Sequence, residues 1–152
     1  MFLFVNYGFF SRTLISPDKY PVGACEFMNE HRLQGNILAS FNWGEYVISH
    51  MAPDSKVFID GRYDTVYPYE IIRKFIWFNY ALPGGDRILE EFPHDYVLIE
   101  PNFPSRKMMD SRADWKLIYQ DSASRLYART DSAAAKIPGV PVTGDSRAAA
   151  FP

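Results

Sequence analysis

The stretch that decides the fold of this chain is VFIDGRYD, at residues 57–64. It begins with an apolar run, which is the pattern of a strand covered on both faces. A charged turn follows this run. We expect residues 57–59 to form a central, buried strand. Ligands of open α/β sheets bind just beyond the carboxyl ends of the strands. Asp60, Arg62 and Asp64 would lie at such an end and are candidate binding residues.

A second segment, FNWGEY at residues 41–46, precedes a short apolar run. It brings together an amide, an indole, a glycine and a carboxylate, so Asn42, Trp43 and Glu45 are further binding candidates. Trp43 has two interpretations. Its ring could stack on the face of a sugar, or it could pack in a turn or in the core, and packing is the favoured interpretation.

Outward from these segments, helices and strands alternate along the chain. Helical spacing and capping residues predict helices at residues 21–34, 43–51, 69–80, 86–92 and 104–112. We expect strands at residues 36–40, 56–60, 96–100, 115–120 and 125–129. Gly35 would end the first helix as a left-handed cap. The alternation predicts an α/β domain whose mostly parallel sheet has about five short strands, helices on both faces and an antiparallel C-terminal hairpin.

The chain has 152 residues, which favours one domain. We divide it into a membrane-proximal arm at 1–19, an α/β domain at 20–130 and a tail at 131–152. The apolar run in the arm is shorter than the roughly 20 residues of a membrane span. It could be a strand or buried arm, or the end of a truncated transmembrane helix. The tail is rich in Ala, Pro, Gly and Ser, so we expect it to be disordered.

Composition excludes several classes of protein. A net charge of −2 argues against nucleic-acid binding, which needs a basic patch. Aromatic residues make up 16% of the chain, which suits an aromatic core or a membrane-proximal surface.

The lone Cys25 rules out an internal disulfide and fits a small buried helix residue. His31, His50 and His94 lack the spacing of metal ligands, so we place them at the surface or at caps and predict no metal site.

Catalytic motifs do not fit the charged segments. Phosphatases of the haloacid-dehalogenase type carry two aspartates two residues apart at a strand end, and Arg62 occupies the second of these positions here. Residues 84–86 lack the Lys and the Ser or Thr of a nucleotide-binding loop. We therefore assign no catalytic residue and no cofactor to this chain.

The charged turn itself has two interpretations. In the structural one, Arg62 pairs with the flanking Asp60 and Asp64, or these side chains cap backbone groups. In the functional one, Arg62 binds a phosphate or carboxylate of a ligand, and the two aspartates accept hydrogen bonds from sugar hydroxyls. The structural interpretation is the favoured one.

Several short motifs together resemble the C-terminal extracytoplasmic domain of polytopic type C membrane glycosyltransferases, which use lipid-linked sugar donors. The motifs are Tyr20-Pro21, Gly35-Asn36, residues 42–46, Pro53, residues 58–62, Tyr67 and the hairpin at 115–129. The resemblance covers residues 20–129. Residues 42–46 lack the Asp-Tyr-Gly core found at a comparable place in oligosaccharyltransferases, so the acceptor-binding role of that motif is not transferred.

The resemblance implies a domain on the extracytoplasmic face of a membrane, in contact with the membrane helices of its parent protein. The catalytic aspartate of that class lies among the first membrane helices, so this chain would not catalyse transfer alone. It would cover the membrane active site and help to bind the acceptor or the lipid-linked donor. Our candidates for ligand binding are Asn42, Trp43, Glu45, Asp60, Arg62, Asp64 and Tyr67. The alternative is a free-standing α/β binding module for a small polar ligand.

Overall fold

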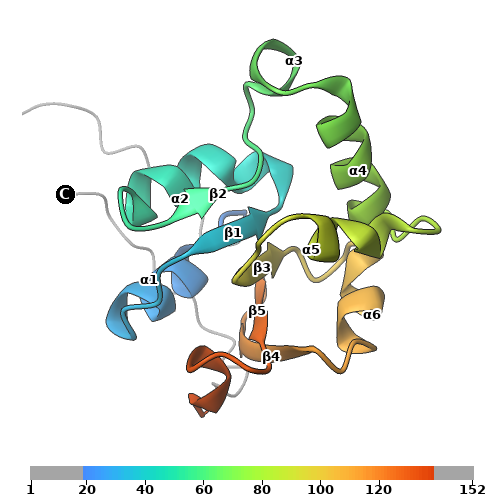
Figure 1. Cartoon of the computed structure of the whole chain (residues 1–152). Helices are drawn as coiled ribbons and strands as arrows, with labels where there is room; N and C mark the ends of the chain where they lie inside the picture. The colour runs from blue at the N-terminus through green and yellow to red at the C-terminus, as the bar shows by residue number, and fades with distance from the viewer. Residues whose placement is uncertain (1–18, 139–152) are drawn as a thin grey trace, which may run out of the picture.

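The computed structural model describes residues 19–138, which form a layered α/β domain around one sheet (Figure 1). The strands are β1 (Asn36–Ala39), β2 (Lys56–Val57), β3 (Tyr96–Ile99), β4 (Trp115–Gln120) and β5 (Arg125–Arg129). They form a five-stranded sheet in the order β2-β1-β3-β5-β4. The α/β class and the five short strands are as the sequence predicts.

The sheet is mixed, whereas the sequence predicted a mostly parallel one. β1 pairs in parallel with β2 and β3, but β5 pairs antiparallel with both β3 and β4. The cause is the position of the C-terminal hairpin. Its second strand, β5, lies directly beside β3, so two of the four strand pairs in the sheet are antiparallel.

Helices cover both faces of the sheet. They are α1 (Val22–Glu30), η1 (Phe41–Trp43), α2 (Gly44–Met51), α3 (Tyr63–Val66), α4 (Tyr69–Asn79), η2 (Gly85–Arg87), α5 (Ile88–Glu91), α6 (Ser105–Asp110) and η3 (Ala134–Lys136). Figure 1 shows α1 and α2 on one side of the sheet, with α4, α5 and α6 on the other. The short α3 and η3 were not predicted.

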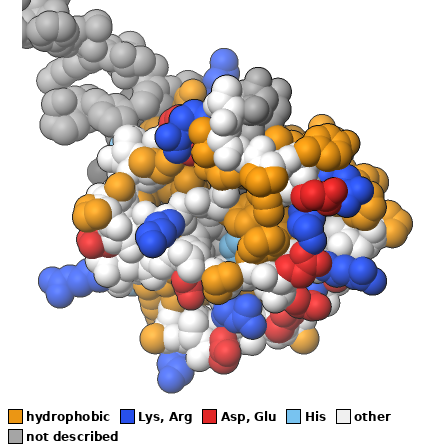
Figure 2. All heavy atoms as spheres, turned by 45° about the horizontal axis from the view of Figure 1, so that its top comes forward, with side chains coloured by type: hydrophobic (Ala, Val, Ile, Leu, Met, Phe, Trp, Pro, Cys, Tyr) orange, Lys and Arg blue, Asp and Glu red, His pale blue; other side chains and the backbone are white. Residues whose placement is uncertain are grey.

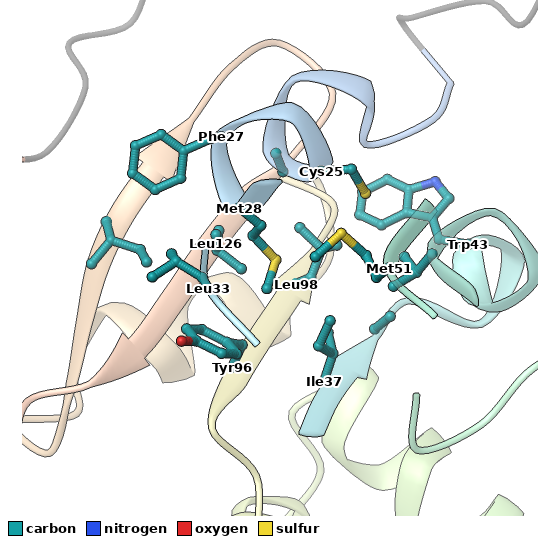
Figure 3. Close-up of a cluster of buried hydrophobic side chains, with 14 of the residues drawn as sticks. Cys25, Phe27, Met28, Leu33, Ile37, Trp43, Met51, Tyr96, Leu98 and Leu126 are labelled. Carbon is teal, nitrogen blue, oxygen red and sulfur yellow. The ribbon is translucent and has the colours of Figure 1, made fainter. Parts of the chain in front are cut away.

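Alternate strand residues divide between two cores, because successive side chains of a strand point to opposite faces. In β1, Ile37 packs into the core under α1 and α2, and Leu38 packs into the core under α4 and α5. Figure 3 shows the first core, where Cys25 and Met51 lie beside Trp43. Cys25 is buried as predicted, and burial raises the pKa of its thiol to about 12.

The strand predicted at 56–60 is shorter than expected and lies at the edge of the sheet, not at its centre. Only Lys56 and Val57 belong to β2, Phe58 is half-buried, and Ile59 is fully buried in the core under α4. After Val57 the chain leaves the sheet and passes close to α2. A Cβ atom at Gly44 would lie 2.6 Å from the Cα of Asp60.

The first helix ends earlier than predicted, and Gly35 is not its cap. α1 ends at Glu30, and the left-handed residue that follows is Arg32, with φ of 53°. Gly35 instead allows a close approach to Asp95, because a Cβ at this glycine would collide with the Asp95 carboxylate. That carboxylate accepts a hydrogen bond of 2.7 Å from the backbone N–H of Asn36.

The tail predicted from residue 131 begins too early. Residues 131–138 belong to the domain, and η3 contacts β4 and β5. It buries Ala134 and Ala135, and Lys116 Nζ donates a 2.6 Å hydrogen bond to the Ala135 carbonyl. The rest of the predicted tail, at 139–152, and residues 1–18 of the predicted arm lie outside the described residues.

Candidate functional site

The charged turn consists of Asp60, Gly61 and Arg62, together with Tyr67. Hydrogen bonds to the Asp60 carboxylate hold Arg62 and Tyr67 in place. Asp60 is only 1% exposed. Its Oδ1 accepts hydrogen bonds of 3.0 Å from the backbone N–H and from Nε of Arg62, and its Oδ2 accepts one of 2.6 Å from Nη2. The Tyr67 hydroxyl donates to the same Oδ2 at 3.1 Å. These donors, first of all the Arg62 side chain, lower the pKa of Asp60 to about 2.

Glu45 connects this turn to the start of α2. Its Oε1 accepts a 2.8 Å hydrogen bond from the backbone N–H of Gly61. The local pairing that the structural interpretation requires is thus present between Asp60 and Arg62. The Arg62 side chain nevertheless remains 63% exposed. A role for these residues in ligand binding stays a prediction.

The other candidates from the sequence are placed differently. Trp43 is 2% exposed, and its Nε1 donates a 2.8 Å hydrogen bond to the Lys19 carbonyl, so it packs in the core as the favoured interpretation had it (Figure 3). Asn42 is exposed in η1. Asp64 lies in α3, but its side chain is outside what the structure describes.

A pocket of about 320 Å³ opens at the carboxyl ends of the parallel strands, and we call it the strand-end pocket. Ser40 directly follows β1, Glu100 directly follows β3, and Ile59 comes shortly after β2. The pocket is lined mainly by apolar side chains, which are Phe41, Ile59, Ile72, Phe75, Ile76, Tyr80 and Phe103. Of the candidates from the sequence, Asn42 lines this pocket. The pocket thus lies where the strand-end rule places ligands, and most of the residues that line it are not among the candidates from the sequence.

Two polar side chains of this pocket are buried, and each has an oxygen that no other described residue satisfies. Ser40 is 2% exposed and Asn79 is 8% exposed. Among the described residues, neither the Oγ of Ser40 nor the Oδ1 of Asn79 has a hydrogen-bond partner. A buried polar atom without a partner is unfavourable, so each such atom calls for an explanation. Beside them, burial raises the pKa of the Glu100 carboxyl above its usual value.

Sequence reasoning missed these three residues, although the sequence contains a signal for each. Ser40 and Glu100 are polar residues directly after apolar strands, as Asp60 is after its own apolar run. Asn79 is an amide on the buried side of α4, where helical spacing predicts an apolar residue. The turn was predicted as a site because its residues are charged. The polar side chains of the pocket, apart from Glu100, are neutral.

His94 was predicted to lie at the surface or at a helix cap, but the structure buries it. It is 3% exposed and lies edge-on to Phe58, with ring centroids 5.0 Å apart. Burial lowers the pKa of its imidazole to about 4.

Within residues 19–138, no three His, Cys, Asp or Glu side chains are grouped to hold a metal ion. In the same residues, no helix combines the length and the apolar character needed to cross a membrane.

No protein-family model, curated protein or solved structure matches this chain. The resemblance to the extracytoplasmic domains of membrane glycosyltransferases therefore remains a prediction from sequence motifs. The function has to be argued from the residues of the site.

Proposed function

We propose that this chain is a ligand-binding domain whose strand-end pocket holds a small hydroxyl-bearing ligand. The observation that carries the proposal is a pair of buried oxygens, Ser40 Oγ and Asn79 Oδ1, that have no partner among the described residues and lie in a pocket lined mainly by apolar side chains. Pockets with apolar walls and a few convergent polar groups are the usual form of a small-molecule site, and about 300 Å³ is the lower end of their size range.

The polar groups of the pocket define what the ligand must offer. The amide oxygen of Asn79 can only accept a hydrogen bond, so the ligand needs a donor. The hydroxyl of Ser40 can donate or accept, and Glu100 accepts when ionised and donates when protonated. A ligand hydroxyl meets all of these requirements. The aromatic rings of Phe41 and Phe103 in the wall offer apolar surface to a sugar ring.

The resemblance over residues 20–129 supports a specific setting for this pocket. In that setting the domain lies on the extracytoplasmic face of a type C glycosyltransferase-like membrane protein, against the parent's membrane helices. It covers the membrane active site and helps to bind the acceptor or the lipid-linked donor. The pocket would serve a free-standing α/β binding module equally well. A reading frame upstream of Met1 that encodes several hydrophobic segments would favour the membrane protein.

Titration of the purified chain with glucose, mannose and galactose, followed by two-dimensional NMR, tests the binding proposal. We expect saturable shifts of the amide signals of Ser40, Asn79 and Glu100 with at least one sugar. Ser40→Ala should weaken that binding by about tenfold, the value of one good hydrogen bond. Ser111→Ala is the matched control, because Ser111 is exposed and its hydroxyl bonds only the Met108 carbonyl in the described part of the chain.

Two results would contradict the proposal. One is the absence of any shift around the pocket with each of the three sugars. The other is equal loss of binding in the Ser40 and Ser111 variants, which would show that the effect does not depend on the pocket.

A further inference from the structure

A second hollow, with a volume of about 740 Å³, adjoins the strand-end pocket, and we call it the α6 hollow. Residues 101–104, which follow β3, and residues 106–108 of α6 form most of its lining. Tyr80 and Phe103 line both the pocket and the hollow, and their rings meet edge-on with centroids 5.9 Å apart. Because Tyr80 is 55% exposed, a ligand in the pocket can extend past its ring into the α6 hollow.

The charged lining of the α6 hollow is basic. It consists of the half-buried Arg106 and the exposed Lys107, and no carboxylate of the described residues lines the hollow. Neither cation forms an ion pair or a side-chain hydrogen bond with another described residue. Asp110, the acidic residue of α6, instead accepts hydrogen bonds of 2.8 Å from Arg125 and from the Tyr127 hydroxyl. The hollow therefore holds two cations that the fold does not compensate.

A hollow of about 410 Å³ beside α4 shows the contrary case. Basic residues line it too, but there Arg73 pairs with Glu70 at 2.6 Å, and Lys74 pairs with Glu91. Figure 2 shows acidic and basic side chains next to each other on one face of the molecule. Pairing of this kind leaves little charge for a ligand, whereas the cations of the α6 hollow are available to an anion from outside the chain.

We propose that the ligand of the strand-end pocket is an anionic sugar, whose phosphate or carboxylate group lies in the α6 hollow beside Arg106 and Lys107. Its hydroxyl groups meet Ser40 and Asn79 in the pocket, so the inference rests on the proposed function and adds the charge of the ligand. A guanidinium binds a phosphate or a carboxylate through two parallel hydrogen bonds, and the ammonium adds a second positive charge.

Glu100 is the carboxyl group that lines the strand-end pocket, and it bears on the charge of the ligand. Burial raises the pKa of Glu100, and an anion bound beside it raises that pKa further. In its neutral form Glu100 donates a hydrogen bond to the ligand and does not repel the anionic group. An anionic sugar is therefore compatible with this residue.

Two-dimensional NMR titration of the full chain tests the inference, with glucose, mannose and galactose each compared with its 6-phosphate and its uronate. We expect at least one anionic sugar to bind about tenfold or more tighter than its neutral parent, the value of a hydrogen bond to a charged group. It should shift the amide signals of Arg106 and Lys107 together with those of Ser40 and Asn79. Added salt should weaken this binding. The two kinds of anionic sugar distinguish a phosphate site from a carboxylate site.

The double variant Arg106→Gln/Lys107→Gln should lower the affinity for the anionic sugar to about that for its neutral parent, and leave the affinity for the parent unchanged. The matched control is Arg32→Gln/Lys136→Gln, which removes the same charges at exposed residues that line neither cavity. It should change either affinity by less than about twofold, since charges beyond a Debye length are largely screened. Both double variants should keep the wild-type urea midpoint, because no ion pair is lost.

The inference and the proposed function fail in different ways. Equal affinity for the neutral and the anionic sugars, or equal losses in the two double variants, would overturn the inference and leave the proposed function standing. Binding of inorganic phosphate as tight as that of the sugar phosphate would overturn it too, because the sugar would then contribute nothing. Shifts confined to α6, with none at Ser40 and Asn79, or no shift with any sugar, would overturn both.

Discussion

The charged turn and the strand-end pocket are neighbours in the fold, but their polar groups are in opposite states. In the turn, Asp60 is buried and receives hydrogen bonds from Arg62 and Tyr67. In the pocket, Ser40 and Asn79 are buried with atoms that no described residue satisfies. In this chain the charged turn is satisfied by its own residues, whereas the pocket keeps two buried oxygens that no described residue satisfies, as the proposed binding of a ligand requires.

The largest effect should come from removing the acceptor at the centre of the turn. Asp60→Ala leaves the Tyr67 hydroxyl and the Arg62 backbone N–H without their partner, and should lower the free energy of unfolding by about 2–3 kcal/mol. Urea unfolding measures the change. Asp54→Ala removes an exposed aspartate and should shift the free energy of unfolding by less than about 0.5 kcal/mol. A loss at Asp60 no larger than at Asp54 would show that the turn is not structural.

Acid should affect the two regions with opposite signs. The folded-state pKa of Asp60 is about 2, below its ordinary value of 3.8. The stability that Asp60 contributes is therefore present above about pH 4 and is lost as the pH falls toward 2. The pKa of Glu100 is raised by burial, so ionisation of Glu100 opposes folding, and stability is gained as the pH falls through its folded-state pKa.

Urea unfolding as a function of pH separates these contributions. Asp60→Asn should remove the loss between pH 4 and pH 2, and Arg62→Ala should reduce it because the pKa of Asp60 returns toward its ordinary value. Glu100→Gln should remove the gain that begins at higher pH. The same sign for the Asp60 and Glu100 variants would mean that the two carboxyl groups are in similar environments, contrary to the comparison.

The sequence predicts local structure well where short-range rules decide it. The hairpin at 115–120 and 125–129 has the predicted boundaries, because alternation and a turn are local signals. The same rules fail at residues 57–59, where an apolar run suggested a central strand. There the chain leaves the sheet after Val57 and packs against α2 at Gly44, a contact between distant residues that a local pattern cannot show. The mixed sheet was missed for a similar reason, since the pairing of β5 with β3 joins distant parts of the chain.

The sequence indicated where a pocket would lie, but not most of the residues that line it. The pocket opens at the carboxyl ends of the strands, and Asn42 lines it. Whether a polar residue is free to bind depends on the partners that the fold gives it. Asp60 acquires its partners within a few residues, whereas Asn79 comes to the pocket on a helix that packs across the sheet. Only the assembled structure separates the two cases.

The smallest effect on stability should come from replacing the Asn79 amide in the pocket with an apolar side chain. Asn79→Leu removes a buried amide oxygen that has no partner among the described residues, and replaces it with a side chain of similar size. The free energy of unfolding should stay the same or rise by up to about 1 kcal/mol, because no hydrogen bond is lost and an unfavourable buried group is removed. Sugar binding in the NMR titration should be abolished by the same variant. A loss of more than about 1 kcal/mol in urea unfolding would show that Asn79 is satisfied in the folded chain, and the pocket would then resemble the charged turn.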